Sequence, residues 1–402
     1  MSNTIQRIAI LGATGSIGTS TLDVITRHPG DFELHTVTAH RDVAGMERIC
    51  RAHHPARAVM ADPDSAAALA RRLQDLDGVE VASGDQCVAA AAADPAVDTV
   101  VAAIVGAAGL ASCLAAVEAG KKVLLANKEA LVVAGELVMA TARRTGARIL
   151  PVDSEHNGVF QCLPGRADAP HGHAGLGEAG VTRLILTASG GPFRERDPAT
   201  FAQIRVDEAC AHPTWRMGRK ISVDSATMMN KGLEVIEACR FFQCQSDQVD
   251  VVIHPQSLVH ALVQYRDGST LAQLGAPDMR TPIAHALGWP GRLDSGVAHL
   301  DITRLGQLDF LPPDGRRFPC LALARDALEA GATATAALNG ANEAAVEAFI
   351  GGALRFDRIH AVIEQTLEHM DRCGDASLDD LVDCEQWART HAADCIRQWG
   401  VA

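Results

Sequence analysis

A glycine-rich turn near the start of the chain constrains its fold more than any other feature. The turn has the sequence GATGSIG at residues 12–18; it follows the apolar run Ile8–Leu11 and precedes Ser20–Arg27, whose apolar spacing predicts a helix. An uninterrupted apolar run of this kind predicts a strand buried on both faces. Glycines allow a tight turn and a close approach of the backbone to a phosphate, and the N–H groups at the start of the helix then point at the anion. The segment therefore predicts a dinucleotide-binding β-turn-α unit.

Strand-like apolar runs alternate with alanine-rich helical segments through the first 152 residues. The further runs are Phe32–Ala39, Arg57–Met60, Val97–Ile104, Lys122–Ala126 and Arg148–Val152. Strands separated by helices imply βαβ units and a parallel sheet with right-handed crossovers. We therefore predict an α/β protein that begins with a Rossmann-type dinucleotide-binding domain over residues 1–152.

The composition excludes several classes of protein. The chain has 402 residues, of which 48% are hydrophobic and 21% charged, and this composition excludes a largely disordered chain. Its net charge of −13 argues against general binding to nucleic acid. The eleven cysteines include no C-x-x-C pair, which is typical of reduced thiols in a cytoplasmic protein. The uncharged stretch Thr99–Val117 could span a bilayer by length, but its glycines predict a strand, a turn and a helix instead. We expect a cytoplasmic protein with neither a signal peptide nor a membrane segment.

The end of the second predicted strand bears on the choice of cofactor. An NAD site usually has Asp or Glu there, bonded to the ribose hydroxyls, whereas an arginine can pair with the 2′-phosphate of NADP. The chain has His40, Arg41 and Asp42 at this point. Arg41 favours NADPH, while Asp42 leaves NAD open as the alternative.

Two carboxylates follow the last strand of the predicted first domain. Asp153 and Glu155 stand at i and i+2 after Arg148–Val152, so on an extended backbone their side chains point to one side. This is also where α/β proteins place ligands, beyond the carboxyl ends of the strands. Two such carboxylates suit a hard divalent cation such as Mg²⁺ or Mn²⁺. Taken alone, such a motif is more often a solvated surface pair than a metal site.

Residues 212–234 carry the densest set of basic and polar side chains. The first part is basic and contains a glycine and a tryptophan, a composition typical of a mobile lid over an anionic ligand. From about Thr227 the pattern predicts a helix on which Asn230 and Glu234 share a face and Lys231 lies beside them. Glu234 could complete a three-carboxylate metal site with the two carboxylates above. The alternative is an ordinary surface ion pair between Glu234 and Lys231.

Two further groups could bind an anion. Lys231, with Asn230 and Ser225, could hold a phosphate. Ser189 follows the predicted strand Val181–Leu186 and precedes two glycines, so its hydroxyl and the neighbouring amides could also donate to an anion. A plain turn is the alternative for the segment around Ser189.

Seven segments, in the same order along nearly the whole chain, resemble the 1-deoxy-D-xylulose 5-phosphate reductoisomerase family. They are GATGSIG at 12–18, ANKEALV at 126–132, VDSEHN at 152–157, TASGGPF at 187–193, HPTWRMGRKISVDSATMMNKGLE at 212–234, HPQSLVHALV at 254–263 and LNGANEAAVEAF at 338–349. The segment at 212–234 is highly specific, whereas the glycine turn is not. The chain departs from the common family pattern at residues 40–42 and at Thr214, where Asn is common.

The resemblance implies an enzyme that is both an oxidoreductase and an isomerase. The family converts 1-deoxy-D-xylulose 5-phosphate to 2-C-methyl-D-erythritol 4-phosphate in the mevalonate-independent methylerythritol phosphate route to isoprenoid precursors. It uses NADPH and a divalent cation, which can be Mg²⁺, Mn²⁺ or Co²⁺. A retro-aldol cleavage and re-addition would rearrange the carbon skeleton before NADPH reduces the resulting aldehyde. The resemblance also implies a homodimer formed through the sheet of the catalytic domain.

The resemblance further implies a role for each matching residue. Metal ligation would fall to Asp153, Glu155 and Glu234. The catalytic residues would be Lys128, Asp153, Glu155, His212 and Glu234. The phosphorylated sugar would contact Lys128, Ser154, Glu155, Ser189, His212, Trp215, Ser225, Asn230, Lys231 and Glu234, with its phosphate on Ser189, Ser225, Asn230 and Lys231. NADPH would be held by Thr14, Gly15, Ser16, Ile17, Arg41, Asn127, Glu129, Met217 and Gly218. His260 is a further candidate near the site.

The rest of the chain predicts two more domains. An α+β catalytic, metal-binding and dimerisation domain is expected over residues 153–290, followed by a linker over 291–315 that is bracketed by Pro-Gly and Pro-Pro-Asp-Gly turns. Residues 316–402 are expected to form a small helical bundle. Its predicted helices are Leu321–Ala330, Asn339–Phe349, Ile359–Met370 and Cys384–Gln398.

Two other functions remain open at this point. A short-chain dehydrogenase-like epimerase would also bind NADP, but that chemistry usually needs Tyr-x-x-x-Lys, and the single tyrosine, Tyr265, has Ser269 four residues on. A non-enzymatic NADP-binding sensor would tolerate the loss of the carboxylates and the lid. The chain retains both of those features.

Overall fold

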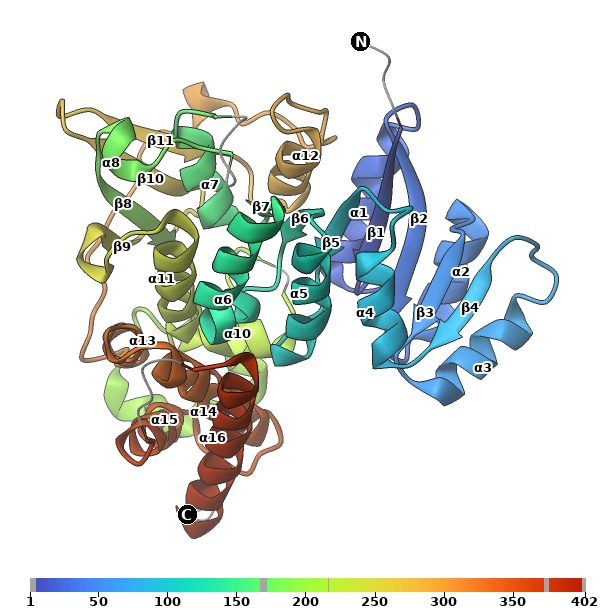
Figure 1. Ribbon diagram of the computed structural model, residues 1–402. Helices are drawn as coiled ribbons and strands as arrows, with labels where there is room; N and C mark the ends of the chain where they lie inside the picture. Colours follow the sequence, from blue (N-terminus) through green and yellow to red (C-terminus); the bar gives the residue numbers. More distant parts are fainter. Residues whose placement is uncertain (1–4, 167–171, 216, 372–375, 400–402) are drawn as a thin grey trace.

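The computed structural model describes residues 5–399 except 167–171, 216 and 372–375. Its first part is a parallel sheet of seven strands in the order β4-β3-β2-β1-β5-β6-β7, as Figure 1 shows. The strands are β1 (Gln6–Leu11), β2 (Phe32–Ala39), β3 (Arg57–Met60), β4 (Glu80–Ser83), β5 (Thr99–Ala102), β6 (Lys122–Leu125) and β7 (Arg148–Pro151). The central strands are enclosed on both faces, which explains their continuous apolar runs. The predicted Rossmann-type sheet is confirmed.

Six α-helices alternate with these strands. They are α1 (Ser16–Arg27), α2 (Val43–His53), α3 (Pro63–Arg72), α4 (Asp85–Ala93), α5 (Leu110–Glu118) and α6 (Glu129–Thr145). Helix α6 is kinked at Ala134, whose φ and ψ of −130° and 30° leave the helical region. Because α6 also packs on helices of the second and third parts, it joins the nucleotide-binding sheet to the rest of the molecule.

The second part contains a mixed sheet in the order β11-β10-β8-β9. Strand β8 pairs in parallel with β9 and antiparallel with β10, and β10 pairs antiparallel with β11. The strands are β8 (Val181–Ala188), β9 (Val249–Ile253), β10 (Val259–Tyr265) and β11 (Thr270–Leu274). The helices around them are α7 (Ser154–Cys162), α8 (Leu176–Ala179), α9 (Val206–Ala209), α10 (Arg219–Ala226), α11 (Met229–Phe242) and α12 (Arg280–Gly288).

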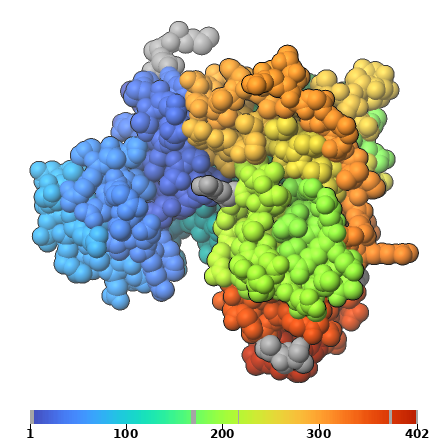
Figure 2. Space-filling view, turned by 180° about the vertical axis from the view of Figure 1, so that it is seen from behind, coloured from blue at the N-terminus to red at the C-terminus, as the bar shows by residue number. Residues whose placement is uncertain are grey.

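The third part is helical and lies at the foot of the molecule in Figure 1. Its helices are α13 (Cys320–Ala330), α14 (Ala332–Ile350), α15 (Ile359–Glu368) and α16 (Leu378–Trp399). Short 3-10 helices are η1 (Ala107–Gly109), η2 (Pro198–Gln203), η3 (Ser246–Gln248), η4 (Ile302–Arg304) and η5 (Phe356–Arg358). Helix α14 packs on α15 and α16 and also on α6 and α10. Figure 2 shows the N-terminal part, in blue, as a lobe beside the rest of the molecule.

Several expectations about local structure differ from the structure. The helix expected from about Thr227 is α11, which begins at Met229; the separate helix α10 before it was not predicted, and Met228 between the two has a φ of 63°. Strand β4 was not predicted, and α14 and α16 begin earlier than expected. The predicted domain limits stay a prediction: residue 152 falls between β7 and α7, and the linker range 291–315 contains η4. Within the described part of the chain, no helix has both the length and the apolar character needed to cross a membrane.

Candidate active site

The glycine turn packs tightly against the loop that follows β5. Gly12 has a φ of +84°, and a Cβ at this position would lie 2.7 Å from the carbonyl oxygen of Ala103. A Cβ on Gly18 would collide with the backbone of Ala13. Gly15, by contrast, is exposed at the N-cap of α1, so the N–H groups of the first turn remain open to a ligand. The residues predicted to contact the cofactor here are Thr14, Gly15, Ser16 and Ile17.

At the end of β2, Arg41 is exposed and Asp42 caps the next helix. The side chain of Arg41 is 71% exposed, and its Nε lies 3.4 Å from Oδ1 of Asp62. Asp42 is the N-cap of α2, and its Oδ1 accepts a hydrogen bond of 2.8 Å from the backbone N–H of Gly45. Because the carboxylate of Asp42 caps a helix, Arg41 is the better placed of the two to meet a cofactor phosphate. This arrangement favours NADPH over NAD.

Asn127 and Glu129 lie buried at the start of α6 and hold neighbouring segments. The Nδ2 of Asn127 donates to the carbonyl oxygens of Ile104 and Gly106, at 2.9 Å to the latter. The Oε1 of Glu129 accepts from Nζ of Lys220 at 2.8 Å. Asn127 therefore holds the loop after β5, against which the glycine turn packs, and Glu129 ties the start of α6 to α10. Their contact with NADPH stays a prediction.

Three carboxylates meet beyond the end of β7. Asp153, Glu155 and Glu234 each place an oxygen atom so that the three atoms lie within 4.8 Å of one another. Asp153 is the N-cap of α7, Glu155 lies in the first turn of α7, and Glu234 lies on α11 with 1% of its surface exposed. The expectation of an extended backbone was wrong, because α7 begins at Ser154 and its first turn carries Glu155. The cluster is no solvated surface pair.

Two buried lysines contact these carboxylates. The Nζ of Lys128 lies 2.7 Å from Oδ2 of Asp153 and 3.0 Å from Oε1 of Glu234. The Nζ of Lys231 lies 2.7 Å from Oε1 of Glu155 and also pairs with Glu234. Lys231 is 3% exposed, so its pair with Glu234 is a buried ion pair and no ordinary surface contact.

Burial and the neighbouring charges together set the pKa values of these groups. Burial alone would lower the pKa of Lys128, but Asp153 and Glu234 raise that pKa well above its ordinary value. The pKa of Lys231 is raised by the same balance, with Glu155 and Glu234 outweighing burial. Burial and the charge of Glu155 raise the pKa of Glu234, although the lysines oppose this. Three carboxylate oxygens in such a setting form the donor set that Mg²⁺ and Mn²⁺ prefer.

The segment after β8 approaches the end of α10 closely. Gly191 has a φ of +69°, and a Cβ there would lie 2.7 Å from the carbonyl oxygen of Ser225. The Oγ of Ser189 accepts from the N–H of Gly191 at 3.1 Å and lies 2.9 Å from Nε2 of His212. The structure therefore brings the segments that carry Ser189, His212 and Ser225 together.

His212 supports the segment that carries Trp215. Its Nδ1 accepts from the backbone N–H groups of Trp215 at 2.9 Å and of Thr214 at 3.2 Å. Since Nδ1 accepts, the proton of the neutral ring lies on Nε2, which donates to Ser189. The ring of Trp215 has its centre 6.0 Å from that of His260. The indole thus lies beside a buried histidine, and both side chains line a small pocket together with Ser154, which stands between Asp153 and Glu155 in the sequence.

We expect the stability of the protein to fall as the pH falls from about 6.5 to about 4. Burial lowers the pKa of His260 to about 4, and burial likewise lowers the pKa of His212 to about 4. The unfolded chain then binds more protons than the folded chain between these values, so stability rises with pH across this window. The free energy of unfolding, measured by urea titration, should be lower at pH 5 than at pH 7.5. His260, which is 7% exposed, should account for about 2 kcal/mol of this difference. A His260→Gln variant with the same pH dependence as the parent would contradict this assignment.

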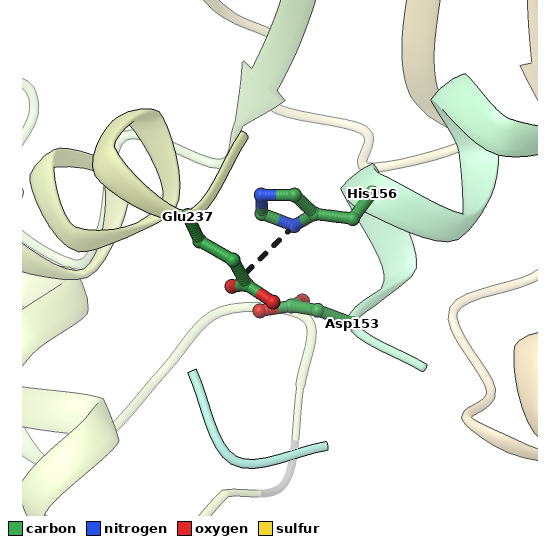
Figure 3. Close-up of side chains that lie close together, drawn as sticks. All are labelled: Asp153, His156 and Glu237. Carbon is green, nitrogen blue, oxygen red and sulfur yellow. Dashed lines mark ion pairs between the residues drawn. The ribbon is translucent and has the colours of Figure 1, made fainter. Parts of the chain in front are cut away.

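Asp153 also belongs to a second cluster, which it forms with His156 and Glu237, as Figure 3 shows. The Nδ1 of His156 on α7 lies 3.7 Å from Oε2 of Glu237 on α11, and each of these two side chains has an atom able to bind a metal within 4.8 Å of an oxygen of Asp153. The Nε2 of His156 also lies 2.9 Å from the backbone carbonyl oxygen of Glu234, to which it donates. His156 therefore ties together the two helices that carry the carboxylates. Neither His156 nor Glu237 was predicted; the available sign was the i, i+3 spacing of Glu237 from Glu234.

Comparisons with known proteins cover nearly the whole chain. A family model described as 1-deoxy-D-xylulose 5-phosphate reductoisomerase matches residues 8–135, and two models of C-terminal domains of the same reductoisomerase match residues 149–242 and 274–391. The 1-deoxy-D-xylulose 5-phosphate reductoisomerases of Pseudomonas putida and Stutzerimonas stutzeri are each 54% identical; the matches cover 98% and 99% of this chain and 99% and 98% of those proteins.

Solved structures give the same result. A structure of DOX-P reductoisomerase in complex with NADPH, fosmidomycin and magnesium has a TM-score of 0.92 at 46% identity and covers 98% of this chain and 99% of that one. A reductoisomerase from Zymomonas mobilis in complex with NADPH has a TM-score of 0.89 at 43% identity, with the same two coverages.

A Rossmann-type sheet beside a buried site of three carboxylates and two lysines defines a class: nucleotide-dependent oxidoreductases whose catalytic centre also suits a divalent cation. The family models and the relatives identify one family within this class. The chain belongs to the 1-deoxy-D-xylulose 5-phosphate reductoisomerase family.

Proposed function

We propose that this chain converts 1-deoxy-D-xylulose 5-phosphate to 2-C-methyl-D-erythritol 4-phosphate, using NADPH and a divalent cation, on the route to isoprenoid precursors. The observation that carries the proposal is the convergence of Asp153, Glu155 and Glu234 with Lys128 and Lys231, in a chain of this family. A sensor that only binds the nucleotide would not need this site. Burying these charged groups is unfavourable, and it contributes nothing to nucleotide binding.

NADPH would bind along the glycine turn, with its pyrophosphate at the N-terminus of α1 and its 2′-phosphate near Arg41. Asn127 and Glu129 would shape the wall of this site, and Met217 and Gly218 would close it from the segment before α10. Gly218 is the exposed N-cap of α10, which suits a backbone that meets a ligand. The cofactor supplies the hydride that reduces the aldehyde.

Asp153, Glu155 and Glu234 would hold the divalent cation. The fit rests on their chemistry: three carboxylate oxygens lie within 4.8 Å of one another, and each carboxylate already contacts a cationic nitrogen or a hydroxyl donor. Mg²⁺, Mn²⁺ and Co²⁺ all accept such donors. The cation supplies Lewis acidity and a template for adjacent substrate oxygens.

The remaining side chains would bind and position the sugar phosphate. Ser189, Ser225, Asn230 and Lys231 would hold the phosphate, and Ser154, His212 and Trp215 would surround the rest of the molecule. Holding the phosphate orients the reacting carbons, since remote binding energy restricts their motion. Lys128 would stabilise developing negative charge on an oxygen and move a proton, because its Nζ lies beside two of the carboxylates. Trp215 would exclude water from the reacting aldehyde.

We further propose that the enzyme is a cytoplasmic homodimer. Ten cysteines of the described residues are free thiols, which supports a reducing compartment. Strand β11 lies at the edge of the mixed sheet, and its Leu271 is 48% exposed. An unpaired edge strand with an exposed apolar side chain supports pairing with a second copy through this sheet.

The test is a reaction followed by NADPH absorbance together with product analysis by NMR. With 1-deoxy-D-xylulose 5-phosphate and Mg²⁺, one NADPH should be consumed for each molecule of 2-C-methyl-D-erythritol 4-phosphate formed. Removal of the metal by a chelator should stop the reaction, and added Mn²⁺ should restore it. A folded protein that binds NADPH but forms no product under any of these metals would overturn the proposal.

Arg41→Gln should lower the preference for NADPH over NADH by about tenfold or more, because it removes a charged partner of the 2′-phosphate. The KM for NADPH should rise while the KM for NADH stays the same. Arg51→Gln is the matched control, since Arg51 is on α2 and pairs with Glu47 and Asp75. Equal changes in the two KM values would show that Arg41 does not contact the phosphate.

A further inference from the structure

One motif of the C-terminal helices lies far in sequence from the proposed active site yet touches it. The segment LNGANEAAVEAF at residues 338–349 lies within α14, which packs on α10. Asn342, which is fully buried, donates from Nδ2 to Oδ1 of Asp224 at 2.8 Å. Asp224 lies on α10 and is 1% exposed. This contact spans 118 residues of sequence and joins the third part of the molecule to the second.

The contact continues to the nucleotide-binding part through a lysine. The Nζ of Lys220 lies 3.1 Å from Oδ2 of Asp224 and 2.8 Å from Oε1 of Glu129. Glu129 is at the start of α6, so the chain of contacts Asn342–Asp224–Lys220–Glu129 links α14, α10 and α6. We call these four residues the α10 anchor.

The α10 anchor holds both ends of a short helix that carries proposed binding residues. Lys220 is the second residue of α10 and follows Gly218, where the segment with Trp215 joins the helix. Asp224 precedes Ser225, which is proposed to bind the substrate phosphate. A shift of α10 would therefore move the proposed lid attachment and a phosphate ligand together.

An asparagine at position 342 would be unfavourable if its only role were to pack in the core. Among the described residues its Oδ1, buried inside the protein, has no hydrogen-bond partner. An unsatisfied buried carbonyl is destabilising, and an apolar residue of similar size would avoid it. The cost is understandable if the amide is kept for its one bond to Asp224.

We propose that Asn342 is a positioning residue of the active site: through Asp224 and Lys220 it sets the position of α10, and thereby the affinity for the sugar phosphate. This rests on the proposed function, because Ser225 and the lid have their roles there. The α10 anchor thus gives the C-terminal helices a role in substrate binding, although no residue on these helices is proposed to contact the substrate, the cofactor or the metal.

The test begins with Asn342→Asp, which places a second carboxylate against Asp224. We expect the KM for 1-deoxy-D-xylulose 5-phosphate to rise about tenfold or more while kcat changes by no more than about threefold. Hydrogen exchange, measured without substrate, should become faster in peptides that cover α10. The double variant Asn342→Asp with Asp224→Asn exchanges the amide and the carboxylate between the two positions, and the amide oxygen at position 224 can still accept a hydrogen bond from Lys220. It should return both the KM and the exchange rate to near the parent values.

Phe349→Leu is the matched control. Phe349 is also buried on α14, but its ring packs on Phe356 at 5.7 Å and it is not part of the α10 anchor. This variant should lower the melting temperature and leave the KM unchanged. An unchanged KM in Asn342→Asp, or a raised KM that the double variant does not restore, would overturn the proposal. If Asn342→Asp does not fold, the double variant decides: a folded protein with the parent KM supports the α10 anchor, and an unfolded one or a raised KM overturns it.

The two proposals fail in different ways. A parent protein that forms no product would reject the proposed function, and the hydrogen-exchange comparison would still test whether Asn342 holds α10. A parent protein that is active, with no difference between the variants, would reject the α10 anchor alone.

Discussion

Replacing Glu234 with glutamine is expected to lower kcat by about a thousandfold or more, because the variant loses an anionic metal ligand. The side chain is fully enclosed between Lys128 and Lys231, so a neutral amide also leaves two buried ammonium groups short of a counter-charge. The dissociation constant of Mn²⁺, measured by electron paramagnetic resonance, should rise by about a hundredfold or more. NADPH binding, measured by fluorescence, should be unchanged, since Glu234 lies on α11 and outside the glycine turn.

Glu237→Gln is the control for this variant. Glu237 is buried on the same helix one turn away, and it faces His156 without belonging to the set of three proposed ligands. We expect its effect on Mn²⁺ affinity to be about tenfold at most. An equal loss in both variants would show that a buried carboxylate is needed here for its charge alone and that Glu234 is no ligand.

Replacing Lys128 with methionine is expected to lower kcat by a similar factor, about a thousandfold, but with the opposite effect on the metal. Methionine keeps most of the apolar stem and removes the ammonium group that lies 2.7 Å from Asp153 and 3.0 Å from Glu234. Those carboxylates lose a competing cation, so Mn²⁺ should bind as tightly as in the parent or more tightly. Steady-state kinetics and a Mn²⁺ titration on the same sample measure both quantities.

Lys231→Met separates this role from phosphate binding. Lys231 contacts Glu155 and Glu234 and is equally buried, but it is proposed to hold the substrate phosphate. Its main effect should be a raised KM for the sugar phosphate, by about tenfold or more. A loss of kcat in Lys128→Met that comes with weaker Mn²⁺ binding would instead make Lys128 a support of the metal site.

The parallel sheet could be predicted because the central strands β1, β5 and β6 are mainly apolar runs that are buried on both faces. Residues Phe32–Ala39 and Arg57–Met60 were predicted with the limits that the structure has. Strand β4, Glu80–Ser83, lies at the edge of the sheet with a half-exposed, mixed composition, so no apolar run marks it. The break between α10 and α11 lies at Met228, where a left-handed backbone falls on a residue with no turn preference.

The members of the site could be predicted, but their geometry could not. The spacing of Asp153 and Glu155 suggested two side chains on one face of a strand, whereas the structure puts them at the cap and first turn of α7. Packing between distant helices determined the rest. No local pattern could place Asn342 beside Asp224 or His156 beside Glu237, because these contacts depend on how α14 meets α10 and how α7 meets α11.

The most direct test of the account is a crystal structure of this protein with Mn²⁺ and NADPH, in which anomalous scattering locates the metal. We predict one strong anomalous peak for each chain, in contact with an oxygen of Asp153, Glu155 and Glu234, with the Nζ atoms of Lys128 and Lys231 moved away from it. A peak between Asp153, His156 and Glu237 instead, or no peak in crystals of active enzyme, would contradict the proposed catalytic centre.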